Sequence, residues 1–131
     1  MISRFFIPAI IWGTIILILT LTPGQFLPKV DYWSVNSLDK YIHFLIFFIE
    51  QIFLLWGSFK KNHSISNKTI ILLLFIGILF GLIIELIQTF IPHRSYDLND
   101  LVANSIGCFL GIFVFFIYIR LNREKLHKFK Y

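Results

Sequence analysis

The sequence predicts an all-α integral membrane protein, a bundle of four transmembrane helices with both termini in the cytoplasm. Of its 131 residues, 57% are hydrophobic and only 15% are charged, and the mean hydropathy is +0.79. So little polar surface cannot cover a soluble domain of this size. Four apolar stretches of roughly 18 to 24 residues each have the length of a helix that crosses about 30 Å of hydrocarbon. Lysine and arginine are also distributed unevenly between the segments that join these stretches.

The first apolar stretch covers about residues 5–21. It follows Arg4 and ends at Pro23-Gly24, a pair that stops helices and turns the chain. A cleaved signal peptide is the competing interpretation, because such a peptide also has a short basic start and an apolar body. The segment Thr20-Leu21-Thr22-Pro23 is a poor small-residue cleavage site, so we expect this stretch to be retained as a span.

Three further stretches predict the remaining spans, at about residues 41–59, 69–91 and 101–118. A short polar, basic loop at 60–68 separates the first two of them. The almost unbroken apolar run from Ile70 to Ile84 lacks the alternation of a β-barrel strand, so helices are favoured. A basic tail at 119–131 follows the last span, which leaves a single transmembrane domain over residues 1–131.

The positive charges predict the orientation in the membrane. With four spans, both termini and the loop between the second and third spans lie on one side, and that side holds nine of the twelve lysines and arginines. The other side holds Lys29, Lys40 and Arg94. Cytoplasmic loops are enriched in lysine and arginine, so both termini should be cytoplasmic and the loops 23–40 and 92–100 should face outward. We therefore expect a multi-pass protein of the cell inner (plasma) membrane.

The remaining composition excludes other classes. The net charge of +5 indicates membrane anchoring, because the 16 phenylalanines lie mostly in lipid-length helices and form no exposed basic face for stacking bases. No nucleic-acid partner is expected. The single cysteine, Cys108, lies inside a span, so neither a disulfide framework nor a thiolate metal cluster can form within one chain.

Polar side chains gather at the ends of the spans that face outward. An ionised group near the bilayer centre costs about 2.5 to 3.5 kcal/mol on insertion scales, so such groups need partners. Asp39 and His43 have i to i+4 spacing and share a helix face, with Lys40 beside them. Asp39 is also placed to cap the second helix.

The third and fourth spans bring more polar side chains to the same surface. They are Glu85, Gln88, Arg94, Asp97, Asp100 and Asn104. All lie within about two helical turns of that surface, at roughly 1.5 Å per residue, and can therefore meet the groups of the second span. We expect a buried Glu85 to be matched by Arg94, His43 or Lys40.

Two glycine pairs predict close helix packing. Gly77 and Gly81 in the third span, and Gly107 and Gly111 in the fourth, each have the small-x-x-x-small spacing that lets helix backbones approach. We expect these pairs to bring the third and fourth helices together, and with them Glu85 and the start of the fourth helix.

The ordered set of these motifs resembles the VanZ-like family of bacterial membrane proteins, over about residues 5–120. The motifs are Pro23-Gly24, Asp39-Lys40-x-x-His43-Phe44, Glu85-x-x-Gln88, Pro92-x-Arg94 and Asp97-x-x-Asp100-x-x-x-Asn104-x-x-Gly107-x-x-x-Gly111. The family takes its name from a protein that raises resistance to the glycopeptide teicoplanin. The resemblance implies a small bacterial inner-membrane protein whose residues of interest lie in these motifs. Glu50, in the second span, matches no position of the family pattern.

The leading functional hypothesis is an outward-facing site for an anionic envelope molecule, either a membrane phospholipid or a lipid-linked cell-wall precursor, with a link to teicoplanin tolerance. Lys40 and Arg94 supply cations at headgroup depth, where the arginine fork suits phosphate. Asp39, Gln88 and Asn104 complete the predicted ligand-binding set.

An enzymatic version of this hypothesis stays open. His43 or Glu85 would act as the general base, and Asp97 with Asp100 would hold a divalent cation that bridges to phosphate oxygens. The chain carries no nucleophilic Ser or Cys motif, Gly-rich phosphate loop or paired-His zinc motif, so hydrolysis by a familiar signature is unsupported.

Two hypotheses from other classes also stay open. In one, the chain is a non-enzymatic accessory protein that packs against a second copy or an envelope protein through its glycine faces, and the polar cluster is an internal clasp. In the other, His43, Glu50 and Glu85 belong to a transporter or proton-conducting unit. The cytoplasmic half offers almost no acids or histidines to complete such a pathway.

Overall fold

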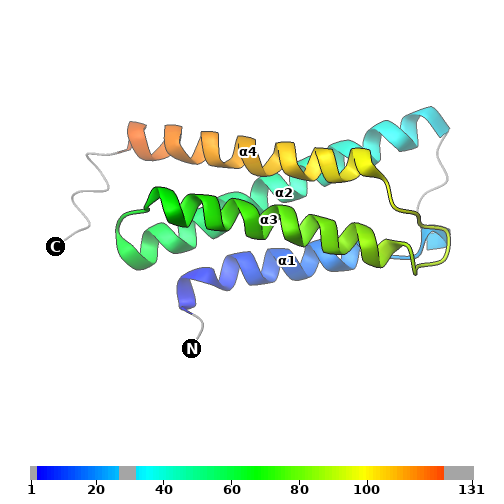
Figure 1. Ribbon diagram of the computed structural model, residues 1–131, viewed down its shortest axis with the longest axis horizontal. Coiled ribbons are helices and arrows are strands. Elements are labelled where there is room, and N and C mark those ends of the chain that lie inside the picture. The colour runs from blue at the N-terminus through cyan, green and yellow to red at the C-terminus, as the bar shows by residue number, and fades with distance from the viewer. Residues whose placement is uncertain (1–2, 27–31, 123–131) are drawn as a thin grey trace.

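A computed structural model describes residues 3–26 and 32–122 of the chain (Figure 1). Within these residues the protein consists of four α-helices and two short 3-10 helices, without strands. In chain order they are η1 (Arg4–Phe6), α1 (Ile7–Thr20), η2 (Gly24–Phe26), α2 (Tyr32–Asn62), α3 (Asn67–Gln88) and α4 (Leu98–Leu121). The predicted all-α class is therefore confirmed. Lys29 and the basic tail from residue 123 onwards lie outside the described residues.

Three of the helices are long and apolar enough to cross a membrane. They are the segment Leu38–Asn62 of α2, the whole of α3 and the whole of α4. The apolar helix at Arg4–Thr20, which combines η1 and α1, is shorter and would reach only about 25 Å at 1.5 Å per residue. The chain is thus a membrane-helix protein, and its described residues contain three full-length candidate spans.

The helix α2 begins at Tyr32, nine residues before the predicted start at 41. The residues from 32 to 40 contain neither glycine nor proline, so nothing in the backbone stops the helix there. The apolar pattern marks only the part that suits lipid, which explains the shorter prediction. Asp39 consequently lies inside α2, and the expectation that it caps this helix is wrong.

The connection between α3 and α4 also differs from the prediction. α3 ends at Gln88 instead of 91, and the chain then turns through His93, whose φ of 61° interrupts helical geometry. α4 begins at Leu98 instead of 101, because the Asp97 carboxylate accepts a hydrogen bond from the Asn99 backbone N–H at 2.8 Å. This N-cap sets the start of the helix.

The central element of the bundle is α2, which contacts each of the other three α-helices and most extensively α4. One buried cluster is formed by Ile16, Ile46, Phe47, Ile84 and Cys108, and a second by Leu55, Leu73 and Phe115. The Trp12 indole N–H donates to the Ile46 carbonyl at 2.9 Å and ties α1 to α2.

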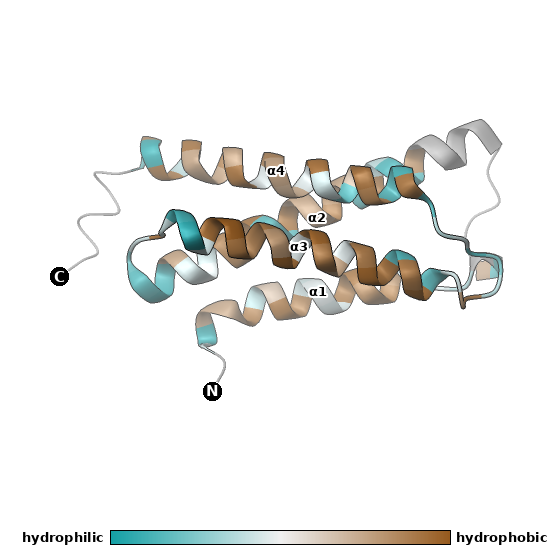
Figure 2. Cartoon of the chain, in the orientation of Figure 1, coloured by the Kyte–Doolittle hydropathy of each residue, from teal (hydrophilic) through white to brown (hydrophobic). Residues whose placement is uncertain are grey.

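The outward faces of the bundle are apolar rather than polar. Figure 2 shows hydrophobic colouring along the length of α3 and α4, and large side chains such as Ile71, Phe75 and Phe113 are exposed. An apolar exterior around a partly polar interior is the arrangement expected of helices that face lipid.

The glycine pairs pack differently from the prediction. Gly107 and Gly111 lie against the backbone of α2 instead of α3: a Cβ at Gly107 would collide with the Phe44 carbonyl, and one at Gly111 would lie 2.9 Å from the Phe48 carbonyl. Gly77 and Gly81 do face α4, where added Cβ atoms would lie 2.9 Å from Cys108 Sγ and 3.1 Å from Asn104 Nδ2, respectively. The closest backbone approach is therefore between α2 and α4.

Substitution of Gly107 by alanine should destabilise the protein by about 1 to 3 kcal/mol, because the new methyl group meets backbone that cannot rotate away. Thermal unfolding of the purified protein in detergent measures this. Gly13→Ala is the matched control, since a Cβ there would lie 3.7 Å from Glu50 Oε1, an ordinary contact. Equal melting temperatures for Gly107→Ala and the unsubstituted protein would contradict the α2–α4 contact.

Candidate functional site

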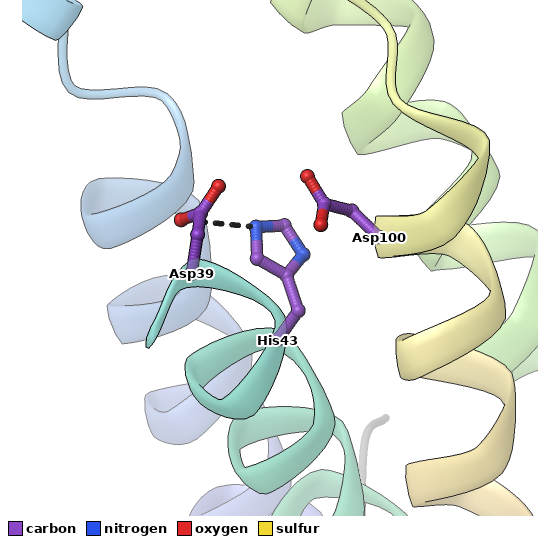
Figure 3. A group of neighbouring side chains, drawn as sticks. All are labelled: Asp39, His43 and Asp100. Atoms are coloured by element: carbon purple, nitrogen blue, oxygen red, sulfur yellow. Dashed lines mark ion pairs between the residues drawn. The ribbon is translucent and has the colours of Figure 1, made fainter. Parts of the chain in front are cut away.

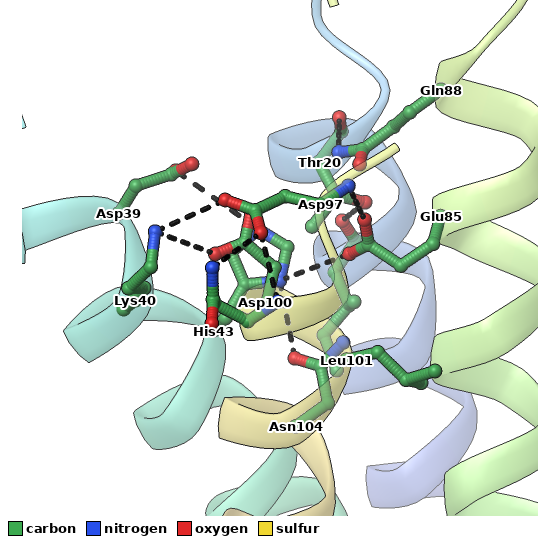
Figure 4. A network of polar contacts seen from close by, with 12 residues as sticks. Thr20, Asp39, Lys40, His43, Glu85, Gln88, Asp97, Asp100, Leu101 and Asn104 are labelled. Atoms are coloured by element: carbon green, nitrogen blue, oxygen red, sulfur yellow. Dashed lines mark hydrogen bonds and ion pairs between the residues drawn. The ribbon is translucent and has the colours of Figure 1, made fainter. Parts of the chain in front are cut away.

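The polar residues predicted to meet do lie together at one end of the bundle (Figure 4). This end contains the start of the apolar segment of α2, the end of α3 and the start of α4. We call the following set the polar cluster: Asp39, Lys40, His43, Glu85, Gln88, Arg94, Asp97, Asp100 and Asn104. Three α-helices and the α3–α4 connection each contribute to it.

His43 is at the centre of the polar cluster and is only 2% exposed. Its Nδ1 lies 3.1 Å from Asn104 Oδ1 and 3.6 Å from Glu85 Oε1. An amide oxygen only accepts hydrogen bonds, so Nδ1 carries the proton and donates it. In the neutral ring, Nε2 then keeps its lone pair, and it lies 4.0 Å from Asp39 Oδ1. Such a ring suits either a general base or a metal ligand.

Glu85 is fully buried and holds the α3–α4 connection. Its Oε2 accepts a hydrogen bond from the Asp97 backbone N–H at 3.3 Å. Its Oε1 accepts no hydrogen bond and faces His43 Nδ1. Of the three partners expected for Glu85, the structure brings His43 to it, while Lys40 and Arg94 pair with other acids.

Lys40 joins α2 to the start of α4. Its Nζ lies 3.1 Å from Asp97 Oδ2, which accepts a hydrogen bond from it, and 3.6 Å from Asp100 Oδ1. The lysine side chain is 28% exposed, whereas that of Asp100 is 7% exposed. Lys40 therefore compensates charge on an acid that is largely removed from solvent.

Arg94 and Gln88 connect the polar cluster to α1. Arg94 lies 3.9 Å from Asp39 through Nη1 and donates from Nε to the Thr22 carbonyl at 3.4 Å. Gln88 Nε2 donates to the Thr20 carbonyl at 2.8 Å, and its side chain is buried. Gln88, whose side-chain amide was predicted to bind a ligand, is thus hydrogen-bonded to the C-terminal end of α1.

Asp97 uses both carboxylate oxygens within the protein. Oδ1 accepts from the backbone and side chain of Asn99, and Oδ2 accepts from Lys40. Burial alone would raise the pKa of Asp97, but these hydrogen bonds and the lysine charge outweigh it and lower the pKa below its usual value. A group of three potential metal ligands brings Asp100 together with Asp39 and His43. The metal pair of Asp97 and Asp100 stays a prediction.

An apolar groove of about 420 Å³ opens beside the polar cluster, between α2 and α4. Lys40, Tyr41, Phe44, Ala103 and Ile106 line it. Of the apolar lining residues only Phe44 belongs to a family motif, and none was predicted to bind a ligand. Their types are those of any lipid-facing helix surface, so no sequence signal separates them from their neighbours.

A second group of buried polar atoms lies deeper in α2. Glu50 Oε2 and both amide atoms of Gln51 are buried without a hydrogen-bond partner in the described structure. Glycines from other helices face them, Gly13 at Glu50 and both Gly77 and Gly111 at Gln51.

Comparison with known proteins identifies the class of this membrane-helix protein. The family model described as VanZ/LLP1 matches residues 5–119. The chain therefore belongs to the VanZ/LLP1 family, as the motif resemblance predicted.

A relative in Schizosaccharomyces pombe (strain 972 / ATCC 24843), the uncharacterized protein C11E3.10, is 32% identical over 93 residues. The match covers 71% of this chain and 56% of the relative, so the chain spans just over half of that protein. No solved structure matches the chain.

Replacement of Asp97 by asparagine should remove a pH-dependent part of the stability. Because the folded-state pKa is lowered, the ionised carboxylate stabilises the protein fully above about pH 5, and this is lost as the pH falls below about 4. Asparagine is also a good N-cap, so the start of α4 is kept. Melting temperatures between pH 3 and 7 should show a difference between the two proteins that shrinks at low pH.

Asn99→Ala serves as the control for this comparison. It leaves the Asp97 carboxylate, its backbone hydrogen bond and its ion pair with Lys40 in place, so the pH dependence should persist. A difference in melting temperature between Asp97→Asn and the unsubstituted protein that stays constant across the pH range would show that ionisation of the carboxylate adds nothing to the stability.

Proposed function

We propose that the polar cluster and the adjoining groove bind the phosphate-bearing headgroup and upper acyl chain of an anionic envelope lipid. The lipid is a membrane phospholipid or a lipid-linked cell-wall precursor, since both present the same phosphate on an apolar chain. The observation that carries the proposal is the position of Lys40, which lines an otherwise apolar groove and whose ammonium reaches the polar cluster. This pairing of a cation with an apolar surface matches an anionic amphiphile.

The groove and its surroundings support this proposal. Tyr41, Phe44 and Ile106 offer an apolar wall on helices that are long enough to cross the bilayer, so a lipid chain could lie against it without displacing protein contacts. Lys40 and Arg94 are each partly exposed and supply the cations for the phosphate. His43, backed by Glu85, supplies a general base if the bound headgroup is also processed.

The proposed orientation places the polar cluster on the outer face of the inner membrane, with η1 and α1 as a fourth span and both termini cytoplasmic. Among the described residues, Arg4, Lys60, Lys61, Lys68 and Arg120 lie at the opposite ends of their helices from the polar cluster. Their excess at that end supports a cytoplasmic location for it. The link to teicoplanin tolerance belongs to the lipid-linked precursor alternative and rests on the family alone.

A non-enzymatic accessory protein is the second candidate, with the polar cluster as an internal clasp. Its support is that Lys40, Arg94 and Gln88 each bridge two elements within the chain. A clasp alone would leave no measurable lipid preference, so lipid binding separates the two candidates.

The orientation can be measured by cysteine accessibility in a Cys108→Ser background. Asn99→Cys and Ser64→Cys place single thiols at exposed positions on opposite ends of the bundle. A membrane-impermeant maleimide added to intact cells should label the thiol at 99 and not the one at 64. After cell lysis both should react. The opposite pattern would reverse the proposed topology.

Lipid binding can be measured by native mass spectrometry of the detergent-solubilised protein with phosphatidylglycerol, undecaprenyl phosphate or phosphatidylcholine. We expect Lys40→Gln to weaken binding of the anionic lipids roughly tenfold, in line with the loss of a charge-assisted hydrogen bond. Ala103→Phe, which fills the groove, should weaken binding too. Lys61→Gln, at the other end of α2, is the matched control and should bind normally.

The two anionic lipids distinguish the sources of the phosphate. Preference for undecaprenyl phosphate supports the cell-wall precursor, and preference for phosphatidylglycerol supports the membrane phospholipid. Unchanged anionic-lipid binding by both Lys40→Gln and Ala103→Phe would refute the proposed site.

A further inference from the structure

Three side chains of the polar cluster converge in a way that the pairing with a lipid phosphate does not explain. Asp39 and His43 come from successive turns of α2, and Asp100 comes from the first turn of α4 (Figure 3). Each offers one potential ligand atom, and these atoms all lie within 4.8 Å of one another. We propose that Asp39, His43 and Asp100 bind a divalent first-row transition-metal ion, with Mn²⁺ and Zn²⁺ as the best-suited ions.

The distances fit a site that needs only a small adjustment. Oxygen and nitrogen ligands lie about 2.0 to 2.2 Å from such an ion, so two ligand atoms are at most about 4.4 Å apart. Inward movement of less than about 1 Å therefore satisfies the observed separations. Asp39 is able to make this movement, because its side chain is 33% exposed.

The imidazole of His43 is oriented as a metal-binding histidine is. Its Nδ1–H is held by Asn104 Oδ1 at 3.1 Å, with Glu85 Oε1 at 3.6 Å behind it. Metal-binding histidines almost always donate their second ring N–H to a carboxylate or carbonyl, which fixes the tautomer. The lone pair of Nε2 is left on the side of Asp39.

The polar cluster contains more carboxylates than lysine and arginine side chains. The ion pairs of the described residues join four carboxylates, of Asp39, Glu85, Asp97 and Asp100, to only two permanent cations, Lys40 and Arg94. If all four carboxylates were ionised, two negative charges would remain without a lysine or arginine partner, which is costly where the acids are buried. One divalent ion would neutralise this excess and also remove the repulsion between these acids and a lipid phosphate.

A buried oxygen in the cluster also lacks a hydrogen-bond partner. Asp100 is 5% exposed, and its Oδ1 accepts no hydrogen bond, with Lys40 Nζ at 3.6 Å. Glu85 Oε1, which faces His43, is likewise buried and accepts no hydrogen bond. Buried polar atoms of native proteins are usually satisfied, so Asp100 Oδ1, which has only a long ion pair with Lys40, is an atom whose contacts a bound cation would complete. Glu85 Oε1 faces Nδ1 of His43 and is not a proposed ligand.

The mixed ligand set indicates the kind of metal. One imidazole with two carboxylates favours Mn²⁺ or Zn²⁺, whereas Mg²⁺ and Ca²⁺ prefer sites made of oxygen alone. Three protein ligands leave positions for water or for a phosphate oxygen. The inference rests on and deepens the proposed function, since the ion would provide a further positive contact for the lipid phosphate beside Lys40 and Arg94, but the site itself depends only on the three side chains.

Metal binding can be measured without lipid, on protein purified in detergent and stripped with a chelator. Titration with Mn²⁺ or Zn²⁺ should load one ion per chain, counted by elemental mass spectrometry, and should raise the melting temperature. Asp100→Asn and His43→Gln should each weaken binding by about tenfold or more. Asp39→Asn is the alternative variant if those two fail to fold, because this residue is the most exposed of the three ligands.

Asp97→Asn is the matched control, because it removes one negative charge from the same cluster but no proposed ligand. It leaves Lys40 to pair with Asp100, so it should weaken ion binding, but by clearly less than Asp100→Asn does. Absence of a bound ion in the unsubstituted protein would overturn the inference. Equal weakening by Asp97→Asn and Asp100→Asn would do the same, since it would show general charge attraction instead of a built site.

Lys40→Gln separates this inference from the proposed function. Its ammonium competes with the ion for Asp100, so its removal should strengthen metal binding while it weakens lipid binding. Lipid binding that depends on Lys40 in a protein that takes up no metal would refute the metal site alone. Metal binding with unaltered lipid binding in Lys40→Gln would refute the proposed lipid site alone.

Discussion

The structure depends on one constraint, which is the cost of holding ionisable side chains inside a bundle of apolar helices. His43 and Glu85 are removed almost completely from solvent, and unpaired charges in such a place are strongly destabilising. The chain offsets this cost because the polar partners of each buried side chain come from other helices. Glu85 on α3 lies beside His43 on α2, which in turn lies beside Asn104 on α4. The same pairings therefore fix the positions of three helices relative to one another.

Small residues make this arrangement sterically accessible. Gly107 and Gly111 let α4 lie directly on the backbone of α2, and Gly81 leaves the room that the Asn104 side chain occupies. Close approach of α2 and α4 is what brings Lys40 to Asp97 and Asp100. Backbone packing and charge pairing thus occur at the same contact between α2 and α4.

The contact between α2 and α4 also unites the two surfaces on which function would depend. On its inner side lies the polar cluster, and on its lipid side lies the groove lined by Tyr41, Phe44 and Ile106. Lys40 belongs to both, since it lines the groove and pairs with the acids of α4. A molecule with a charged head and an apolar chain is the kind of ligand for which such a junction is suited.

The sequence by itself determined the helical class, the membrane setting and which residues form the polar cluster. These follow from local regularities: apolar length, and spacings such as that of Asp39 and His43, which helical geometry alone converts into proximity. The family assignment was likewise carried by motifs in the sequence, and the family match confirmed it.

Only the tertiary structure decided which side chains form ion pairs and hydrogen bonds with one another. Lys40 could have compensated Glu85 as well as Asp97, and Arg94 could have paired with Glu85 instead of Asp39. The choice depends on the rotation and axial position of each helix, which are set by the packing of all side chains at once and leave no mark at any single position. For the same reason the groove could not be predicted from the sequence. Phe44 and Ile106 line a groove only because α2 and α4 pack against each other.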